Sequence, residues 1–134
     1  QRATTIWLLL LPAPLIVAAV AGPGHPAFWL TMAIELAIGV VFGSMTVRVG
    51  EGRLDWWFGP GLWRYSRPLG QVVSATPVEN RWWWGWGIRA TPHGWLYNVS
   101  GLGAVEIATR DGRTLRIGTD EPERLAAAVE AARG

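Results

Sequence analysis

The chain of 134 residues contains no cysteine and only two histidines. Without cysteine it can form neither a disulfide framework nor a thiolate metal site. The histidines, His25 and His93, lie far apart in turns that contain glycine and proline, so they do not form a pair with metal-ligand spacing. We therefore expect no metal and no cofactor. A nucleophile with a matching base is equally hard to find, so we do not expect an enzyme.

Lysine is also absent, and all 12 basic residues are arginine. The 10 acidic residues are interleaved with them, which leaves a net charge of only +2. A nucleic-acid-binding protein would concentrate positive charge on one face or along one segment. We therefore expect no nucleic-acid partner.

Charge is scarcest at the N-terminal end, where only two charged residues precede Arg48. Two apolar helices are predicted at about 4–22 and 27–45, joined by a short turn at 22–26 that contains glycine and proline. A helix of about 20 residues rises roughly 30 Å, the thickness of the hydrocarbon core of a bilayer. The sequence therefore predicts that residues 1–45 form a hairpin of two transmembrane helices.

The same segment also has features of a cleaved secretory signal, with Arg2 before an apolar run and small residues at 19–21. A retained hairpin explains both apolar segments, and we follow that interpretation. Arg2, Arg48 and Arg53 flank the predicted spans, whereas the turn between them has no basic residue. The positive-inside rule then predicts an integral membrane protein with two spans, whose termini and C-terminal domain are cytoplasmic.

One face of the second predicted helix carries Glu35, Gly39 and Gly43 at spacings of four residues. A carboxyl group in hydrocarbon is costly unless it is protonated or hydrogen-bonded. The two glycines form a small-residue surface that lets another helix approach closely. This face is predicted either to dock on a partner subunit or to pack on the first helix of the hairpin. The sequence favours neither alternative.

From residue 46 onward the apolar pattern changes to short segments separated by glycine, proline and aspartate. Such spacing predicts a small barrel or sandwich in a domain at 46–134. A C-terminal helix is predicted at 121–132, because Asp120 and Glu123 form a capping pair and Pro122 suits the first turn. The eight predicted strands are at 46–49, 53–58, 62–66, 71–78, 86–90, 95–99, 104–109 and 114–117.

Four stretches of the sequence carry a resemblance to a known family. They read VRVGEGRLDWWFGPG, PLGQVVSATPVE, WGWGIRATPHGWLYNVSG and AVEIATRDGRTLRIGTDEPERLAAAVEAA. Together they resemble bacterial pleckstrin-homology-like (PH-like) domains attached to a two-helix membrane hairpin. The resemblance implies a barrel of about seven or eight antiparallel strands, in two nearly orthogonal sheets, capped by one C-terminal helix. It implies a binding scaffold for lipid head groups, peptides or proteins, and no reaction.

A phosphoinositide head group would require several basic residues around the first hairpin of such a domain. That turn, at 49–53, has one acidic and one basic residue, so the usual cradle is missing. Arg64 and Arg67, near the second turn, are predicted to attract an anionic lipid surface with about 1 kcal/mol each.

Tryptophan is the distinctive residue, with 10 in the chain. Trp82, Trp83, Trp84 and Trp86 follow one another closely, and in an extended strand neighbouring side chains point to opposite faces. We therefore expect Trp82 and Trp84 to share one side, and some of the four rings to contact lipid or another protein.

These features predict a non-enzymatic, membrane-anchored binding or scaffold module. It is expected to dock as a small accessory or stabilising subunit on a larger membrane protein complex. The alternative is a peripheral sensor of anionic lipid surfaces with the same fold. The predicted interface with a partner or with the lipid bilayer comprises Glu35, Gly39, Gly43, Arg64, Arg67, Trp82, Trp83, Trp84 and Trp86.

Overall fold

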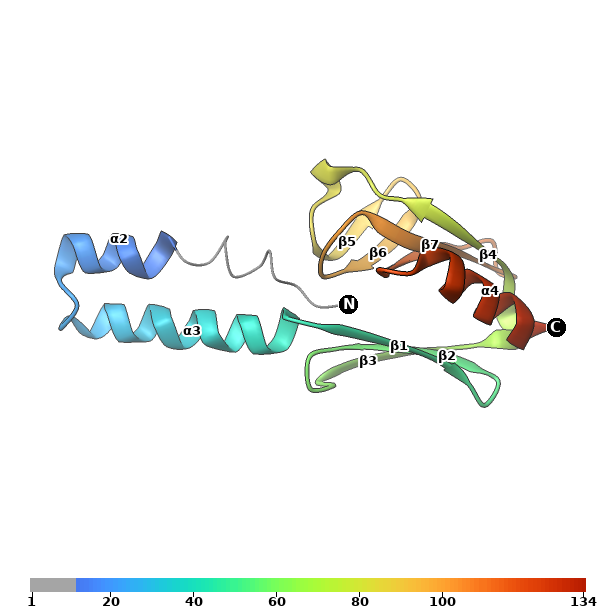
Figure 1. Ribbon diagram of the computed structural model, residues 1–134, viewed down its shortest axis with the longest axis horizontal. Coiled ribbons are helices and arrows are strands. Elements are labelled where there is room, and N and C mark those ends of the chain that lie inside the picture. Colours follow the sequence, from blue (N-terminus) through green and yellow to red (C-terminus); the bar gives the residue numbers. More distant parts are fainter. Residues whose placement is uncertain (1–11) are drawn as a thin grey trace.

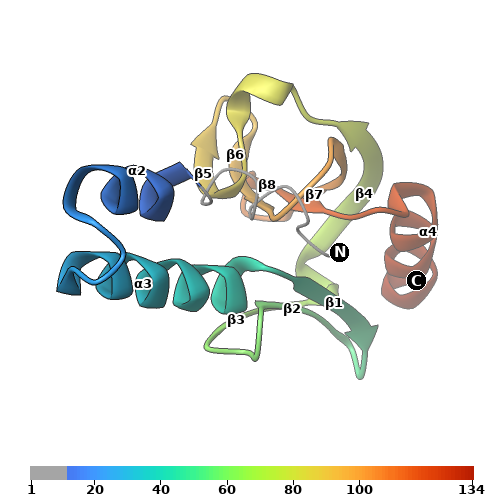
Figure 2. The ribbon, with the colours of Figure 1, turned by 60° about the vertical axis from the view of Figure 1, so that its left-hand side comes forward.

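The computed structural model describes residues 12–134. A hairpin of two helices, α2 (Pro12–Ala21) and α3 (Pro26–Phe42), extends from one end of a β domain (Figures 1 and 2). The C-terminal helix α4 (Pro122–Arg133) lies at the other end of that domain. The hairpin, the β domain and α4 therefore follow one another along the long axis of the molecule.

The turn of the hairpin follows directly from its residues. Gly22 adopts a φ of +85°, and its N–H donates to the Ala18 carbonyl at 3.0 Å, which ends α2. His25 then caps α3, since its Nδ1 accepts a hydrogen bond from the Ala27 N–H at 3.1 Å. Pro26 follows at the first helical position, where its missing N–H costs nothing.

The prediction of two transmembrane helices is wrong. α2 has 10 residues and α3 has 17, and between residues 12 and 134 no helix is long and apolar enough to cross a membrane. The second helix was predicted too long, because the last residues of the apolar run belong to the first strand, β1 (Met45–Gly50), and not to a helix. Part of the first predicted helix, at about 4–22, lies outside the described residues.

Without transmembrane helices, the predicted membrane localisation and the predicted cytoplasmic placement are not supported either. The integral membrane localisation depended on both helices crossing a bilayer, and no described helix can do so. The cytoplasmic placement of the termini and of the C-terminal domain was derived from arginines flanking those spans, so it loses its basis as well.

The β domain consists of two sheets. The first has the order β1-β2-β3, with β2 at Arg53–Phe58 and β3 at Trp63–Pro68. The second has the order β4-β7-β8-β6-β5. Its strands are β4 (Val72–Glu79), β5 (Gly87–Thr91), β6 (Gly94–Asn98), β7 (Gly103–Thr109) and β8 (Thr114–Gly118).

All eight strands predicted from the sequence are present, and the C-terminal helix predicted at 121–132 is α4. Two one-turn 3₁₀ helices complete the domain, η1 (Leu69–Gln71) between the sheets and η2 (Trp82–Trp84) between β4 and β5. The PH-like resemblance itself stays a prediction.

One pairing differs from the antiparallel barrel that was predicted: β6 and β8 run parallel. After β6 the chain turns through residues 98–101 and enters β7, which pairs with the other side of β8. Asn98 fixes this turn, because its Nδ2 donates to the Gly101 carbonyl at 3.0 Å and its Oδ1 accepts from the Ser100 N–H at 3.3 Å. The period-2 pattern reports strands but not which neighbour each strand pairs with.

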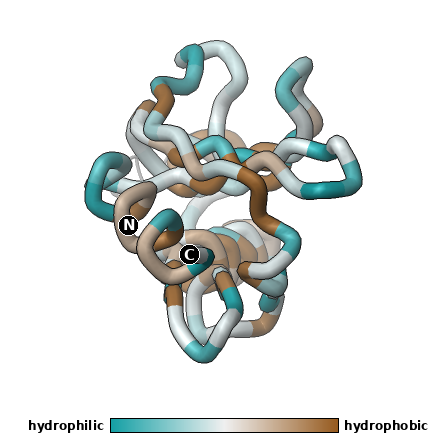
Figure 3. The backbone as a smooth tube through the Cα atoms, turned by 90° about the vertical axis from the view of Figure 1, so that its right-hand side faces the viewer, coloured by the Kyte–Doolittle hydropathy of each residue, from teal (hydrophilic) through white to brown (hydrophobic). Residues whose placement is uncertain are grey.

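The core lies between the two sheets, and hydrophilic segments lie mostly at the outer turns (Figure 3). Its centre is aromatic, since Trp56 lies 5.6 Å from Tyr65 and 5.2 Å from Tyr97 between ring centroids. Burial, followed by the neighbouring Tyr65, raises the pKa of the Tyr97 hydroxyl. Ala126 and Val129 of α4 are buried against the same core.

Glu130 fastens α4 to the edge strand β4. Its Oε1 accepts a hydrogen bond from the Ala75 N–H at 2.6 Å, and its Oε2 lies 2.5 Å from Arg133 Nε. These hydrogen bonds, that of Ala75 first, lower the pKa of the Glu130 carboxyl. The carboxylate thus satisfies an edge N–H that no neighbouring strand can reach.

We predict that Glu130→Ala lowers the thermal midpoint at pH 7 more than Glu123→Ala, which removes an exposed carboxylate of the same helix. A lowered pKa contributes stability above the unfolded value of about 4.3, and this contribution is lost as the pH falls through the folded value. The difference between Glu130→Ala and the wild-type chain should therefore shrink in acid. Melting curves between pH 7 and pH 3 measure it, and a constant difference would contradict the assignment.

Candidate functional site

The four tryptophans do not lie on an extended strand. Trp82–Trp84 form the one-turn 3₁₀ helix η2, with the Trp84 N–H donating to the Arg81 carbonyl at 3.0 Å. Gly85 ends the turn with a φ of +68°, a conformation that L side chains rarely adopt. Three residues per turn spread the rings around the helix axis, so the expected alternation, with Trp82 and Trp84 on one side, is wrong.

Trp82 and Trp83 point into solvent. They are 72% and 57% exposed, and their rings form a T-shaped pair with centroids 5.8 Å apart. The Arg81 guanidinium lies 5.0 Å from the centroid of Trp83. This arrangement combines a large apolar surface with a cation held on a ring face.

Trp84 serves the fold of the β domain. Its ring lies 5.6 Å from that of His93 and 5.1 Å from the guanidinium carbon of Arg116. The Arg116 side chain is only 8% exposed and is paired with Glu106 on β7, at 2.7 Å between Nη2 and Oε2. Asn80 Oδ1 accepts a further hydrogen bond from Arg116 at 3.4 Å. Trp84 therefore covers the buried Arg116, whose partner Glu106 is partly exposed, on the face of the five-stranded sheet that points away from the core.

Removing one member of this ion pair should be costly. We predict that Glu106→Ala lowers the free energy of unfolding by about 3 kcal/mol, because it leaves the buried Arg116 unpaired. The double variant Glu106→Leu/Arg116→Met should recover much of that loss, since an apolar pair leaves no buried charge. Chemical denaturation measures both, and a loss below about 1 kcal/mol for Glu106→Ala would mean that the pair behaves as a surface ion pair.

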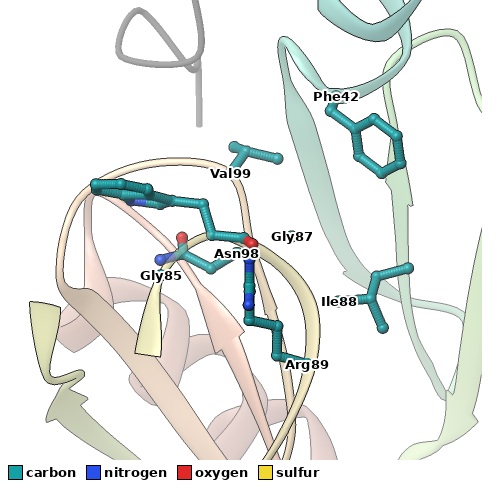
Figure 4. A pocket seen from close by; sticks show the side chains of 8 residues that line it. Phe42, Gly85, Gly87, Ile88, Arg89, Asn98 and Val99 are labelled. Carbon is teal, nitrogen blue, oxygen red and sulfur yellow. Dashed lines mark hydrogen bonds between the residues drawn. The ribbon is translucent and has the colours of Figure 1, made fainter. Parts of the chain in front are cut away.

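A cavity of about 580 Å³ opens at the end of the β domain where α3 enters it (Figure 4). Figure 4 shows Phe42, the last residue of α3, on one side, and Val99, Asn98 and Arg89 on the other. The described residues of the lining are mainly apolar, and none of them is acidic. They are Phe42, Gly85, Trp86, Gly87, Ile88, Arg89, Asn98 and Val99.

The predicted helix face is partly covered within the chain. Glu35 and Gly39 are the buried residues of α3, which packs against α2, whereas Gly43 caps the end of the helix. Glu35 Oε1 has no hydrogen-bond partner among the described residues. The burial of Glu35 and Gly39 favours packing inside the hairpin over contact with a partner.

The two arginines predicted to meet lipid lie on the three-stranded sheet. Arg64 and Arg67 are exposed residues of β3, and the Arg64 guanidinium lies 4.9 Å from the ring centroid of Trp57. Figures 1 and 2 both place β3 and η2 on opposite sides of the β domain. The structure therefore does not bring these arginines together with Trp82 and Trp83.

The described residues contain no group of three or more histidine, cysteine or acidic side chains that could hold a metal ion. His25 is used as a helix cap, and His93 lies against Trp84. The pKa of Asp111 is lowered, first by the Thr109 hydroxyl and then by the Arg113 N–H, and these contacts close the turn between β7 and β8.

Sequence reasoning missed the Arg116–Glu106 pair and the cavity. A signal for the pair exists, because Arg116 stands between the apolar Leu115 and Ile117 in a predicted strand. Because neighbouring side chains of a strand point to opposite faces, Arg116 lies on the face opposite to Leu115 and Ile117. A charged side chain that is buried on that face needs a partner of opposite charge. No comparable signal marks the cavity, since its walls come from α3, β5 and β6.

Comparison with known proteins gives no relative: no family model, no curated protein and no solved structure matches the chain.

Proposed function

We propose that this protein is a non-enzymatic binding module that docks, as a small accessory subunit, on a larger protein complex. The observation that carries the proposal is the exposure of large apolar side chains on the hairpin and of Trp82 and Trp83 on η2. Surfaces of this kind on a folded protein mark interaction sites.

The hairpin supplies most of this surface. Between residues 12 and 42 the only charged side chain is that of Glu35, and it is buried. Large apolar side chains cover the outside of the hairpin and have no cover among the described residues. They are Leu15, Ile16, Val20, Trp29, Leu30, Met32, Ile34, Leu36 and Val40. A partner must therefore offer an apolar surface in return.

Trp82 and Trp83 are the residues expected to contribute most of the binding energy and the specificity. Tryptophan and arginine are enriched among the residues that dominate binding energy at protein interfaces, and here Arg81 is already held against Trp83. The short turn fixes the backbone that carries both rings, and the rings contact each other and Arg81. Rings that are held in place before binding lose less entropy when a partner covers them.

An anionic lipid surface is the other class of partner predicted from the sequence. That prediction joins the tryptophans to Arg64 and Arg67, and these arginines lie on the opposite side of the domain. The separation favours a protein partner, and lipid binding becomes an outcome of the experiment.

We predict that Trp82→Ser/Trp83→Ser weakens binding to the purified partner complex by about 100-fold, since two central tryptophans contribute roughly 3 kcal/mol together. The partner is first captured with the full chain from a gentle detergent extract of the native cells. Its affinity for each variant is then measured with purified components. Trp95→Ser is the matched control, because Trp95 is also an exposed tryptophan but lies on β6.

The fold of each variant is checked by its melting curve, which should change little because both replaced rings are exposed. An unchanged partner affinity for the double variant would overturn the proposal. So would a wild-type chain that captures no partner but binds vesicles of anionic lipid through Trp82 and Trp83, since that result would assign the surface to lipid.

A further inference from the structure

We propose that the cavity between α3 and the five-stranded sheet binds a linear fatty carboxylate. The apolar chain would lie between Phe42, Ile88 and Val99, and the carboxylate would bind the Arg89 guanidinium. This ligand site is separate from the surface proposed to dock a protein partner, and it does not depend on that proposal.

The size and lining of the cavity fit a small apolar ligand. Its volume of about 580 Å³ lies within the range of roughly 300 to 1,000 Å³ that is usual for ligand pockets. Phe42 and Ile88 are partly buried and pack against the hydrophobic core, so the walls are held by the fold. An apolar chain placed there would contact side chains whose positions are already fixed.

Arg89 supplies the charge: it lines the cavity, and its side chain is exposed to solvent. Its Nε donates to the Trp86 carbonyl at 2.9 Å, which holds the guanidinium beside the loop at 85–87. Its terminal nitrogens form no ion pair with any residue between 12 and 134. No acidic residue is among the described residues that line the cavity. A guanidinium in this position can bind a carboxylate with two parallel hydrogen bonds.

Asn98 and Trp86 also carry polar groups in the lining. Asn98 donates to the Gly101 carbonyl and accepts from the Ser100 N–H, and these hydrogen bonds hold its amide in the turn after β6. Among the described residues that line the cavity Arg89 is the one cation, so the lining does not suit a polyphosphate, which needs several cations. A single negative charge on a long apolar chain matches it best.

The test is a titration of the full chain with decanoate and, separately, with the uncharged decanol, followed by calorimetry and tryptophan fluorescence. We expect saturable binding of one decanoate and a preference for decanoate over decanol of about tenfold. Arg89→Gln should remove that preference, and Arg89→Lys should keep part of it. Arg110→Gln is the matched control, because Arg110 is an exposed arginine outside the cavity and should leave the preference unchanged.

The variant Ile88→Trp separates the cavity from the exposed hairpin, since a larger side chain fills the cavity and leaves the hairpin unaltered. Loss of decanoate binding in a folded Ile88→Trp chain supports the proposal, and retained binding would overturn it by placing the ligand on the hairpin. Equal binding of decanoate and decanol by the wild-type chain would overturn it as well. If Ile88→Trp does not fold, the comparison of Arg89→Gln with Arg110→Gln still decides the question.

Discussion

The two sheets of the β domain share no backbone hydrogen bonds, so the side chains packed between them hold the domain together. Trp56 of the smaller sheet is in ring contact with Tyr97 of the larger one. α4 covers the gap at one end and is fastened there by Glu130. At the other end no C-terminal helix covers the opening, and the chain places Phe42 and the cavity there instead. Among the described residues, α4 therefore closes one end of the domain, whereas the cavity opens at the other.

The β domain was predictable because each strand carries its own local signal. Asp111 and Gly112 mark the last hairpin, and the apolar alternation from 104 to 109 and from 114 to 117 marks its strands. The membrane-spanning length of the hairpin helices was mispredicted for the opposite reason: the absence of charge continues from α3 into β1, so it does not mark where α3 ends. Strand order was also out of reach, since the parallel pairing of β6 and β8 depends on contacts between distant residues.

The tryptophan segment shows where pattern reading stops. The sequence predicts correctly that not every ring can be buried, but it assumes an extended strand. Gly85 and the hydrogen bond to the Arg81 carbonyl turn the segment into η2, and that turn sends Trp84 onto the buried Arg116. Which tryptophan is structural and which is exposed is therefore set by one local turn and by an ion pair formed between two other strands.

Phe42 connects the hairpin with the cavity. It is the last residue of α3, it stacks on Trp63 with ring centroids 5.4 Å apart, and it forms one wall of the cavity. Phe42 therefore joins the end of α3 to β3 and also bounds the cavity, so the position of the hairpin on the β domain sets the shape of this wall.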